Sequence, residues 1–134
     1  MRGGCLCGRI RYEVSAAPLG QAVCHCTHCQ RQAGSAFSVL VVVPAAALKI
    51  EGVPAVYEDK GDSGARVERH FCGHCGSPIY SGLPASPGAV FLKAGSLDDT
   101  SGLDPKLHVW CDSAWAWTAF PEDAIRIAKS PPSG

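Results

Sequence analysis

Seven of the eight cysteines in this 134-residue chain lie in three short clusters, and their spacing is that of metal ligands. The clusters are Cys5-Leu6-Cys7, Cys24-His25-Cys26-Thr27-His28-Cys29 and Cys72-Gly73-His74-Cys75. Thiolates that share a metal must converge on one point, and pairs one or two residues apart on a tight turn do so readily. Zinc is the usual metal of such sets, and seven ligands exceed the four that one tetrahedral ion accepts. The sequence therefore predicts two zinc ions.

Disulfides and thiol redox chemistry are the alternative uses of these cysteines. The first residues, Met1 to Cys5, lack the apolar segment of a secretory signal peptide, so we expect a reducing, cytoplasmic setting. A bridge between Cys5 and Cys7 would also be strained, because their Cα atoms would lie near the upper limit for a disulfide. The βαβ pattern typical of redox CxxC proteins is absent from the expected elements. Bound metal therefore explains the clusters better.

The first and third clusters have the features of a closed structural site. Cys72 and Cys75 flank a turn between two expected strands, and Cys5 and Cys7 lie among glycines in the same way. Glycine permits the turn that aims backbone amides at the sulfurs. Four thiolates close a tetrahedral site, which stabilises a fold and leaves no position for a reactant.

The middle cluster differs because it supplies three thiolates. They are Cys24, Cys26 and Cys29. Three protein ligands with one vacant position is the pattern of a catalytic zinc, although His25, His28 or Cys111 could instead complete a closed site. Extended backbone would point His25 away from the sulfurs, whereas His28 is less constrained. An open three-cysteine site is also expected to lose its zinc more readily, so it could be partly empty.

Length and charge limit the class of protein. We expect a single zinc-binding domain over residues 1–128 and a frayed tail over 129–134. The chain has 12 basic and 12 acidic residues, which argues against a general nucleic-acid binder. No apolar run approaches the roughly 20 residues that span a bilayer. The expected partners therefore include neither nucleic acid nor membrane, and the sequence leaves the oligomeric state open.

The elements that position the clusters are predicted to be mainly strands. Residues 9–14 and 48–51 alternate polar and apolar side chains, and residues 37–43 form an apolar run that ends at Pro44. Glycine (15 residues) and proline (10 residues) interrupt the chain at short intervals, as antiparallel sheets of many strands require. Further strands are expected at 55–58, 67–71, 78–81, 90–94 and 107–111, and short helical turns at 27–33, 44–48 and 122–125.

The ordered set of clusters resembles the glutathione-dependent formaldehyde-activating enzyme family, which is also grouped with centromere protein V. The resemblance extends from about Gly3 to Trp117, nearly the whole chain. The residues that carry it are Gly4-Cys5-Leu6-Cys7-Gly8, Cys24-His25-Cys26-Thr27-His28-Cys29, Phe71-Cys72-Gly73-His74-Cys75-Gly76, Gln30 to Phe37, and His108-Val109-Trp110 leading to Trp115 and Trp117.

The resemblance implies a β-tent fold, in which small antiparallel sheets are organised around zinc with little helix. It assigns Cys5, Cys7, Cys72 and Cys75 to a structural zinc, and Cys24, Cys26 and Cys29 to a second, catalytic zinc. It also implies a carbon–sulfur lyase that reversibly joins glutathione and formaldehyde into S-hydroxymethylglutathione. The alternative function is a zinc-binding scaffold or interaction domain without catalysis.

Other residues are candidates for roles around the second zinc. Coordination would deprotonate an incoming thiol for attack on an aldehyde carbon, and His25 or His28 could pass a proton to the developing hydroxyl. Either could equally be a supporting or surface histidine. Arg31 could bind a carboxylate of glutathione or be a solvated charge.

The remaining candidates are expected to be structural. Cys111 is interpreted as a small buried hydrophobe rather than a ligand. His108 is interpreted as a hydrogen-bonded strand residue. Core or pocket-wall positions are expected for Trp110, Trp115 and Trp117.

Overall fold

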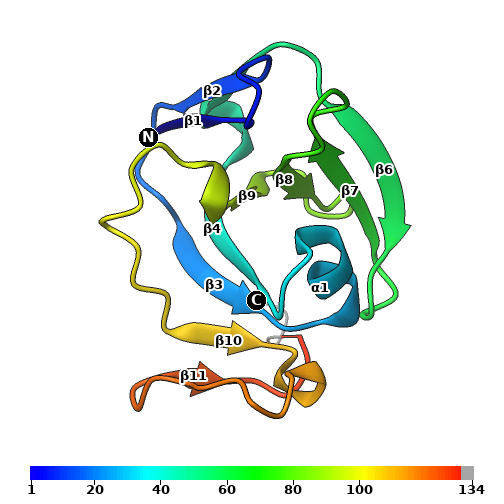
Figure 1. Cartoon of the computed structure of the whole chain (residues 1–134), viewed down its shortest axis with the longest axis vertical. Coiled ribbons are helices and arrows are strands. Elements are labelled where there is room, and N and C mark those ends of the chain that lie inside the picture. Colours follow the sequence, from blue (N-terminus) through cyan, green and yellow to red (C-terminus); the bar gives the residue numbers. More distant parts are fainter. Residues whose placement is uncertain (131–134) are drawn as a thin grey trace.

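The computed structural model describes residues 1–130, which form two β-sheets and one short α-helix (Figure 1). The strands are β1 (Arg2–Gly4), β2 (Arg11–Val14), β3 (Gly20–Cys24), β4 (Ser38–Pro44), β5 (Leu48–Glu51), β6 (Ala55–Lys60), β7 (Arg66–Phe71), β8 (Pro78–Gly82), β9 (Ala89–Lys93), β10 (Leu107–Val109) and β11 (Ile125–Arg126). The helix is α1 (Thr27–Ala33), and three single turns of 3-10 helix are η1 (Ala45–Ala47), η2 (Ala94–Ser96) and η3 (Cys111–Ser113).

The smaller sheet has the strand order β1-β2-β5, and the larger sheet has the order β11-β10-β3-β4-β9-β8-β7-β6. The prediction of a mainly β fold with little helix is therefore confirmed. Most neighbouring strands pair antiparallel, as expected, but β10 pairs parallel with both β3 and β11. The parallel pairing of β10 with β3 places Val109 opposite Cys24 and so brings a distant segment beside the middle cluster.

The expected helix at 27–33 matches α1, and its two ends explain its length. Cys26 is the N-cap, with extended backbone, and its sulfur accepts a hydrogen bond from the amide of Cys29. Gly34 ends the helix in the left-handed conformation, with φ of 64°. The helix is thus one short segment held between a cysteine cap and a glycine.

Several expected boundaries were wrong. Strands β1, β3 and β11 were not predicted, because each is short and lacks a clear alternation. The strand expected at 107–111 stops at Val109, since Trp110 takes a left-handed φ of 58° that no strand continues. The segment 122–125 forms a turn closed by Ala124 N–H on the carbonyl of Pro121, and Ile125 then enters β11.

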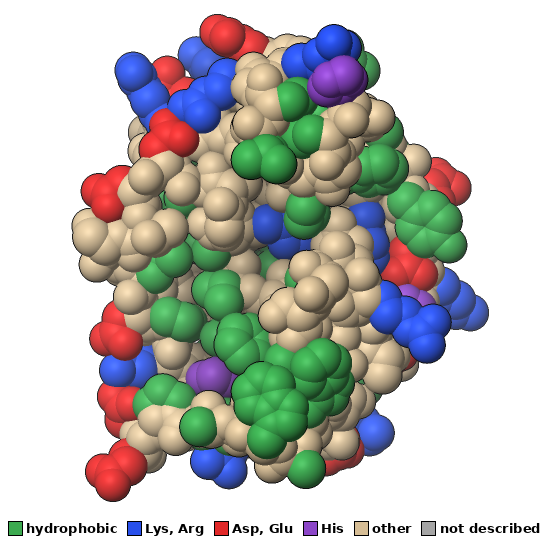
Figure 2. Space-filling model, viewed as in Figure 1, with side chains coloured by type: hydrophobic (Ala, Val, Ile, Leu, Met, Phe, Trp, Pro, Cys, Tyr) green, Lys and Arg blue, Asp and Glu red, His purple; other side chains and the backbone are tan. Residues whose placement is uncertain are grey.

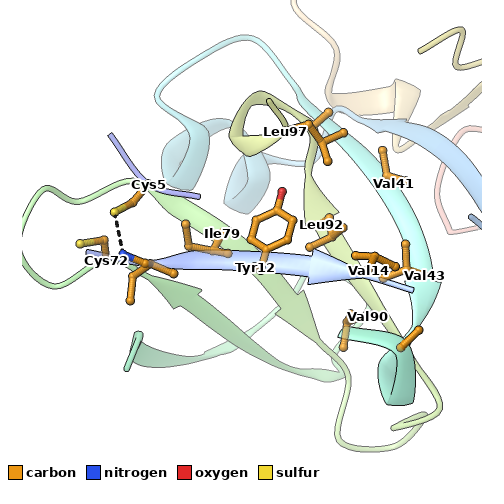
Figure 3. Close-up of a cluster of buried hydrophobic side chains, with 13 residues drawn as sticks. Cys5, Tyr12, Val14, Val41, Val43, Cys72, Ile79, Val90, Leu92 and Leu97 are labelled. Atoms are coloured by element: carbon orange, nitrogen blue, oxygen red, sulfur yellow. Dashed lines mark hydrogen bonds between the residues drawn. The ribbon is translucent and has the colours of Figure 1, made fainter. Parts of the chain in front are cut away.

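Two separate clusters of buried side chains form the core, and each contains one of the cysteine groups. The larger cluster lies between the two sheets and contains Cys5 and Cys72 beside Ile79 and Leu92, which are fully buried (Figure 3). The smaller cluster contains the three cysteines of the middle cluster with Leu40. Cysteines of both groups are therefore part of the hydrophobic core, although Cys7 is exposed.

The C-terminal segment is only partly described. Of the predicted tail at 129–134, residues 131–134 lie outside the described residues, and the carbonyl of Lys129 accepts a hydrogen bond from Trp110 N–H at 3.0 Å. In the described range 1–130, no helix has both the length and the apolar character needed to cross a membrane.

Candidate metal centres

The first centre is the group formed by Cys5, Cys7, Cys72 and Cys75, whose sulfur atoms all lie within 4.8 Å of one another. Cys5 and Cys7 follow β1, while Cys72 and Cys75 lie in the turn that joins β7 to β8. Gly76 completes that turn with φ of 80°, a conformation that glycine adopts at little cost. The fold thus brings together sulfurs from distant parts of the sequence. The sulfurs of Cys7 and Cys72 contact each other although the two residues are 65 positions apart.

Hydrogen-bond donors surround these sulfurs. The amide of Ile10 donates to Cys5 Sγ at 3.2 Å, and the amide of Cys75 donates to Cys72 Sγ at 3.5 Å. The hydroxyl of Ser77 lies 3.2 Å from Cys75 Sγ, and hydrogen bonds from Ser77 hold the pKa of Cys75 at about 5. Donors of this kind stabilise thiolates, which are the form that binds metal. The donor set therefore fits a closed four-coordinate metal site.

The second centre consists of Cys24, Cys26 and Cys29, whose sulfur atoms also lie within 4.8 Å of one another. Cys24 ends β3, Cys26 caps α1, and Cys29 lies in the first turn of the helix. All three are buried. In a straight strand these three side chains would not all lie on one face. The turn from strand into helix therefore brings them together.

The three thiols interact strongly with one another. Hydrogen bonds from Cys24 and then Cys26 lower the pKa of Cys29, and positive charge on Lys93 and Arg69 lowers it further despite burial. Hydrogen bonds with Cys26 and Cys29, together with burial, raise the pKa of Cys24. The three sulfurs thus form a crowded, buried and strongly interacting set. A divalent cation would relieve this crowding by accepting all three as thiolates, so the donors fit a metal ion.

A cavity of about 190 Å³ opens over this centre. Its walls include all three cysteines, Trp110 and the hairpin tip at 61–63. Its floor is one face of the larger sheet, because side chains opposite one another in neighbouring strands share a face. Leu40 pairs with Lys93, Phe91 pairs with Ser81, and Ser81 pairs with Arg69. The sheet register thus places two cations and a hydroxyl beside the sulfurs.

Arg69 is held in place by a buried ion pair. Its Nε donates to Asp59 Oδ2 at 2.8 Å, and its side chain also interacts with Cys29. Burial raises the pKa of Asp59, but the hydrogen bonds from Arg69 and His28 outweigh it, so the pKa lies below its ordinary value. Asp59 therefore fixes the cation that faces the sulfur of Cys29.

Two further polar groups of the cavity have few partners. Lys93 is 5% exposed, and its ammonium donates to Ser38 Oγ at 3.2 Å. Burial lowers the pKa of Lys93, while charge on Cys29 opposes that shift. The buried hydroxyl of Ser81 has no hydrogen-bond partner in the described part of the chain. Both residues line the cavity, and the described residues leave part of their hydrogen-bonding capacity unfilled.

The candidates for a fourth ligand lie elsewhere. His25 is fully buried, and its Nε2 lies 3.0 Å from His108 Nδ1. His28 contacts Asp59 at 2.8 Å through Nδ1 and a second aspartate at 3.2 Å through Nε2. Cys111 is half-buried, with its sulfur 3.5 Å from the carbonyl of His108. Within residues 1–130, none of the three joins the sulfurs of the second centre.

The positions of Arg31 and the three tryptophans agree only in part with those expected from the sequence. Arg31 is exposed on α1 and is not part of the cavity wall. Trp110 lines the cavity, as expected of a pocket wall. Trp115 and Trp117 were expected to be buried, but they are 43% and 72% exposed and pack against each other on the surface. Aromatic residues near a motif do not by themselves reveal burial.

Arg69, Asp59, Lys93 and Ser81 were missed by the sequence reasoning. Arg69 and Ser81 alternate with apolar residues, and Lys93 ends the apolar run Val90-Phe91-Leu92. A charged or polar side chain at the end of an apolar run, or on the inward side of an alternating strand, is the signal that could have found these three. Asp59, between Glu58 and Lys60, carries no such signal.

Comparisons with known proteins agree with this geometry. The family described as "Glutathione-dependent formaldehyde-activating enzyme" matches residues 1–113. A protein of Halomonas elongata named "Putative glutathione-dependent formaldehyde-activating enzyme" is 27% identical over 123 residues, which cover 87% of this chain and 78% of that protein. A crystal structure of a Rhodobacter sphaeroides protein has a similar fold, with a TM-score of 0.58 and 19% identity over 78% of this chain and 92% of that chain. Since the family match spans most of the sequence and includes both cysteine groups, the chain belongs to the glutathione-dependent formaldehyde-activating enzyme family.

Proposed function

We propose that the chain is a carbon–sulfur lyase-type enzyme that reversibly joins a small thiol to an aldehyde, with glutathione and formaldehyde as the reactants. Zinc is proposed at both cysteine groups, with a structural role at Cys5, Cys7, Cys72 and Cys75 and a catalytic role at Cys24, Cys26 and Cys29. The cytoplasm, where thiols stay reduced, is the proposed compartment. The family match supports the reactants, and the donor sets support the metal.

One observation carries the proposal: three buried thiols converge in the wall of a cavity without a fourth Cys or His among them in the described residues. Three ligands and an accessible remaining position are what a metal needs in order to bind a reactant. The chemistry that zinc bound at this site supplies is a lower pKa for an incoming thiol, which then reacts as a thiolate.

In the forward reaction the thiol sulfur attacks the carbon of formaldehyde. A carbon–sulfur bond forms, the carbonyl π bond opens onto oxygen, and the proton lost by the thiol ends on the new hydroxyl. The unpartnered hydroxyl of Ser81 is placed to donate a hydrogen bond to that oxygen as it becomes negative. Arg69, fixed by Asp59, faces Cys29 and offsets the negative charge of the sulfurs.

Proton transfer by His25 or His28 receives no support from the geometry. Neither histidine lines the cavity, and each is engaged with other side chains. In this proposal the proton reaches the hydroxyl through Ser81 or solvent.

The test is to mix zinc-loaded protein with glutathione and formaldehyde and to follow exchange of the adduct by NMR. We expect exchange faster than the spontaneous rate in proportion to protein concentration. A Cys24→Ser variant should lose the acceleration while it keeps the metal of the four-cysteine group. An exchange rate equal to the spontaneous rate at stoichiometric protein would rule the proposal out.

A further inference from the structure

The geometry points to a second binding site next to the reaction site, in which Lys93 and the larger neighbouring cavity bind a carboxylate of the thiol substrate. The inference rests on the proposed function for the identity of that substrate. It makes Lys93 a specificity-determining residue, through which the enzyme prefers thiols that carry a carboxylate over neutral thiols.

The ammonium of Lys93 is buried beside the sulfurs of the second centre and has no carboxylate partner among residues 1–130. Lys93 is 5% exposed, and its single hydrogen bond in the described residues is to Ser38 Oγ at 3.2 Å. An ammonium has three N–H donors, and leaving such donors unpaired inside a protein is costly. The buried cation is therefore suited to an anionic ligand.

Lys93 lines two cavities. One is the cavity of about 190 Å³ over the three thiols, and the other has a volume of about 730 Å³. Ser38, which accepts the hydrogen bond from its ammonium, lines the larger cavity. A volume of this size is in the range of small-molecule sites, so one substrate can occupy both cavities and pass Lys93.

The wall of the larger cavity favours a polar, anionic guest. The hydroxyl-bearing residues around it are Ser35, Ser38, Ser77 and Ser96. Arg11 also lines it, but the guanidinium of Arg11 is already paired with Asp98. Lys93 is thus the cation of this wall without a carboxylate partner among residues 1–130. Figure 2 shows the hollowed face between β4 and α1, with basic side chains inside the hollow.

The expected selectivity follows from the unpaired donors. A substrate carboxylate supplies acceptors for the ammonium of Lys93, and charge-assisted hydrogen bonds are the stronger kind. A neutral thiol leaves the same donors unsatisfied after it has displaced water. A site built to bond one group discriminates strongly against an analogue that lacks it.

The experiment separates the carboxylate site from the chemistry by using S-methylglutathione, which keeps both carboxylates but has no free thiol. Zinc-loaded protein is titrated with this probe, and backbone amide shifts of Ser35 and Gly95, which line the larger cavity, report binding. We expect saturable shifts, and a Kd at least about tenfold weaker for the dimethyl ester of the probe.

Two variants test the assignment to Lys93. Lys93→Met keeps the length of the side chain and removes the charge, and we expect it to weaken binding of the probe to the level of the ester. Lys106→Met makes the same substitution at a cation that lines neither cavity and is paired with Asp104 and Asp123, and binding should stay close to wild type. The ester comparison on the wild-type protein needs no variant, so it stands even if Lys93→Met does not fold.

The inference is overturned if the probe gives no saturable shifts, if the ester binds as tightly as the acid, or if Lys106→Met and folded Lys93→Met weaken binding equally. Failure of the proposed function gives a different result. In that case the probe would bind through Lys93 while glutathione and formaldehyde exchange at the spontaneous rate.

Discussion

The four-cysteine group and the three-cysteine group use the same side chain in opposite surroundings. Around the first, the donors to sulfur are mostly backbone amides and a serine hydroxyl, and Cys7 is exposed at the surface. Around the second, all three cysteines are buried beside the cations Arg69 and Lys93, under a cavity. Backbone donors fix a site in one geometry, whereas side-chain cations and open space leave room for a reactant.

The two groups also differ in what they connect. Cys5 and Cys7 lie near the N-terminus and meet Cys72 and Cys75 in the turn between β7 and β8, so this group joins the two sheets. The three-cysteine group is contained in residues 24–29 and joins little beyond one strand and one helix. The same ligand chemistry therefore stabilises a fold only when the ligands come from distant segments.

The largest expected effect is therefore on folding. Cys72→Ser should abolish the cooperative unfolding transition, because structural zinc contributes about 10 kcal/mol or more, comparable to the whole stability of a domain. Cys24→Ser should keep a cooperative transition. Thermal unfolding followed by circular dichroism at equal zinc concentration distinguishes the two variants. Equal melting temperatures would contradict the expected difference between the two cysteine groups.

A smaller effect is expected at the cation of the second group. Arg69→Met leaves the carboxylate of Asp59 with His28 and the amide of Lys60 but without its cation, and should reduce the free energy of unfolding by about 3 kcal/mol. Arg11→Met, at the exposed pair with Asp98, should change stability little. Urea unfolding measures both, and a similar loss for the two variants would show that burial of the first pair has no energetic consequence.

The next effect in size is expected on the rate of adduct exchange when the hydroxyl of Ser81 is removed. Ser81→Ala should lower the rate of adduct exchange about tenfold, the effect of losing one hydrogen bond of about 1.4 kcal/mol in the transition state. Stability should stay unchanged or rise slightly, since the hydroxyl is buried without a partner. NMR exchange rates and urea unfolding are the two measurements. An unchanged rate would remove Ser81 from the reaction.

The smallest expected effect is the pH dependence of the Asp59 contribution. Its pKa in the folded protein lies below its ordinary value, so the stabilisation is fully present above about pH 4 and is lost as pH falls through the folded pKa. The stability difference between wild type and Asp59→Asn should therefore stay constant from pH 7 to about pH 4. A difference that already shrinks between pH 6 and pH 5 would mean that burial, which raises the pKa, prevails over Arg69.

Much of the difference between the two cysteine groups could be predicted from the sequence. The spacing of the cysteines predicted two groups of four and three, and the structure brings together the sulfurs of each group. Local signals were sufficient there, because CxC, CxxC and glycine turns determine nearby geometry without long-range information. The helix at 27–33 was predictable for the same reason, since its cap and its terminating glycine are both local.

The sequence could have indicated that Lys93 and Arg69 are buried charges, but their position beside the second group could not be predicted because it depends on strand register. Lys93 and Arg69 come from β9 and β7, and the alternation of a strand does not reveal which face will meet α1. The parallel pairing of β10 with β3 could not be predicted for a similar reason, because it joins Val109 to Cys24 across most of the chain. Pairings of this kind follow from packing of the whole domain.

Cys26 has a consequence for how long each metal stays bound. Its sulfur is a proposed ligand and also the cap that accepts the amide of Cys29 at the start of α1. Fraying of one helical turn would therefore withdraw a ligand, and local opening of this kind costs far less than global unfolding. Release from the four-cysteine group requires separation of two distant segments. A metal held by the three-cysteine group should accordingly exchange with solution through local opening, whereas a metal held by the four-cysteine group should be released only when the two segments separate.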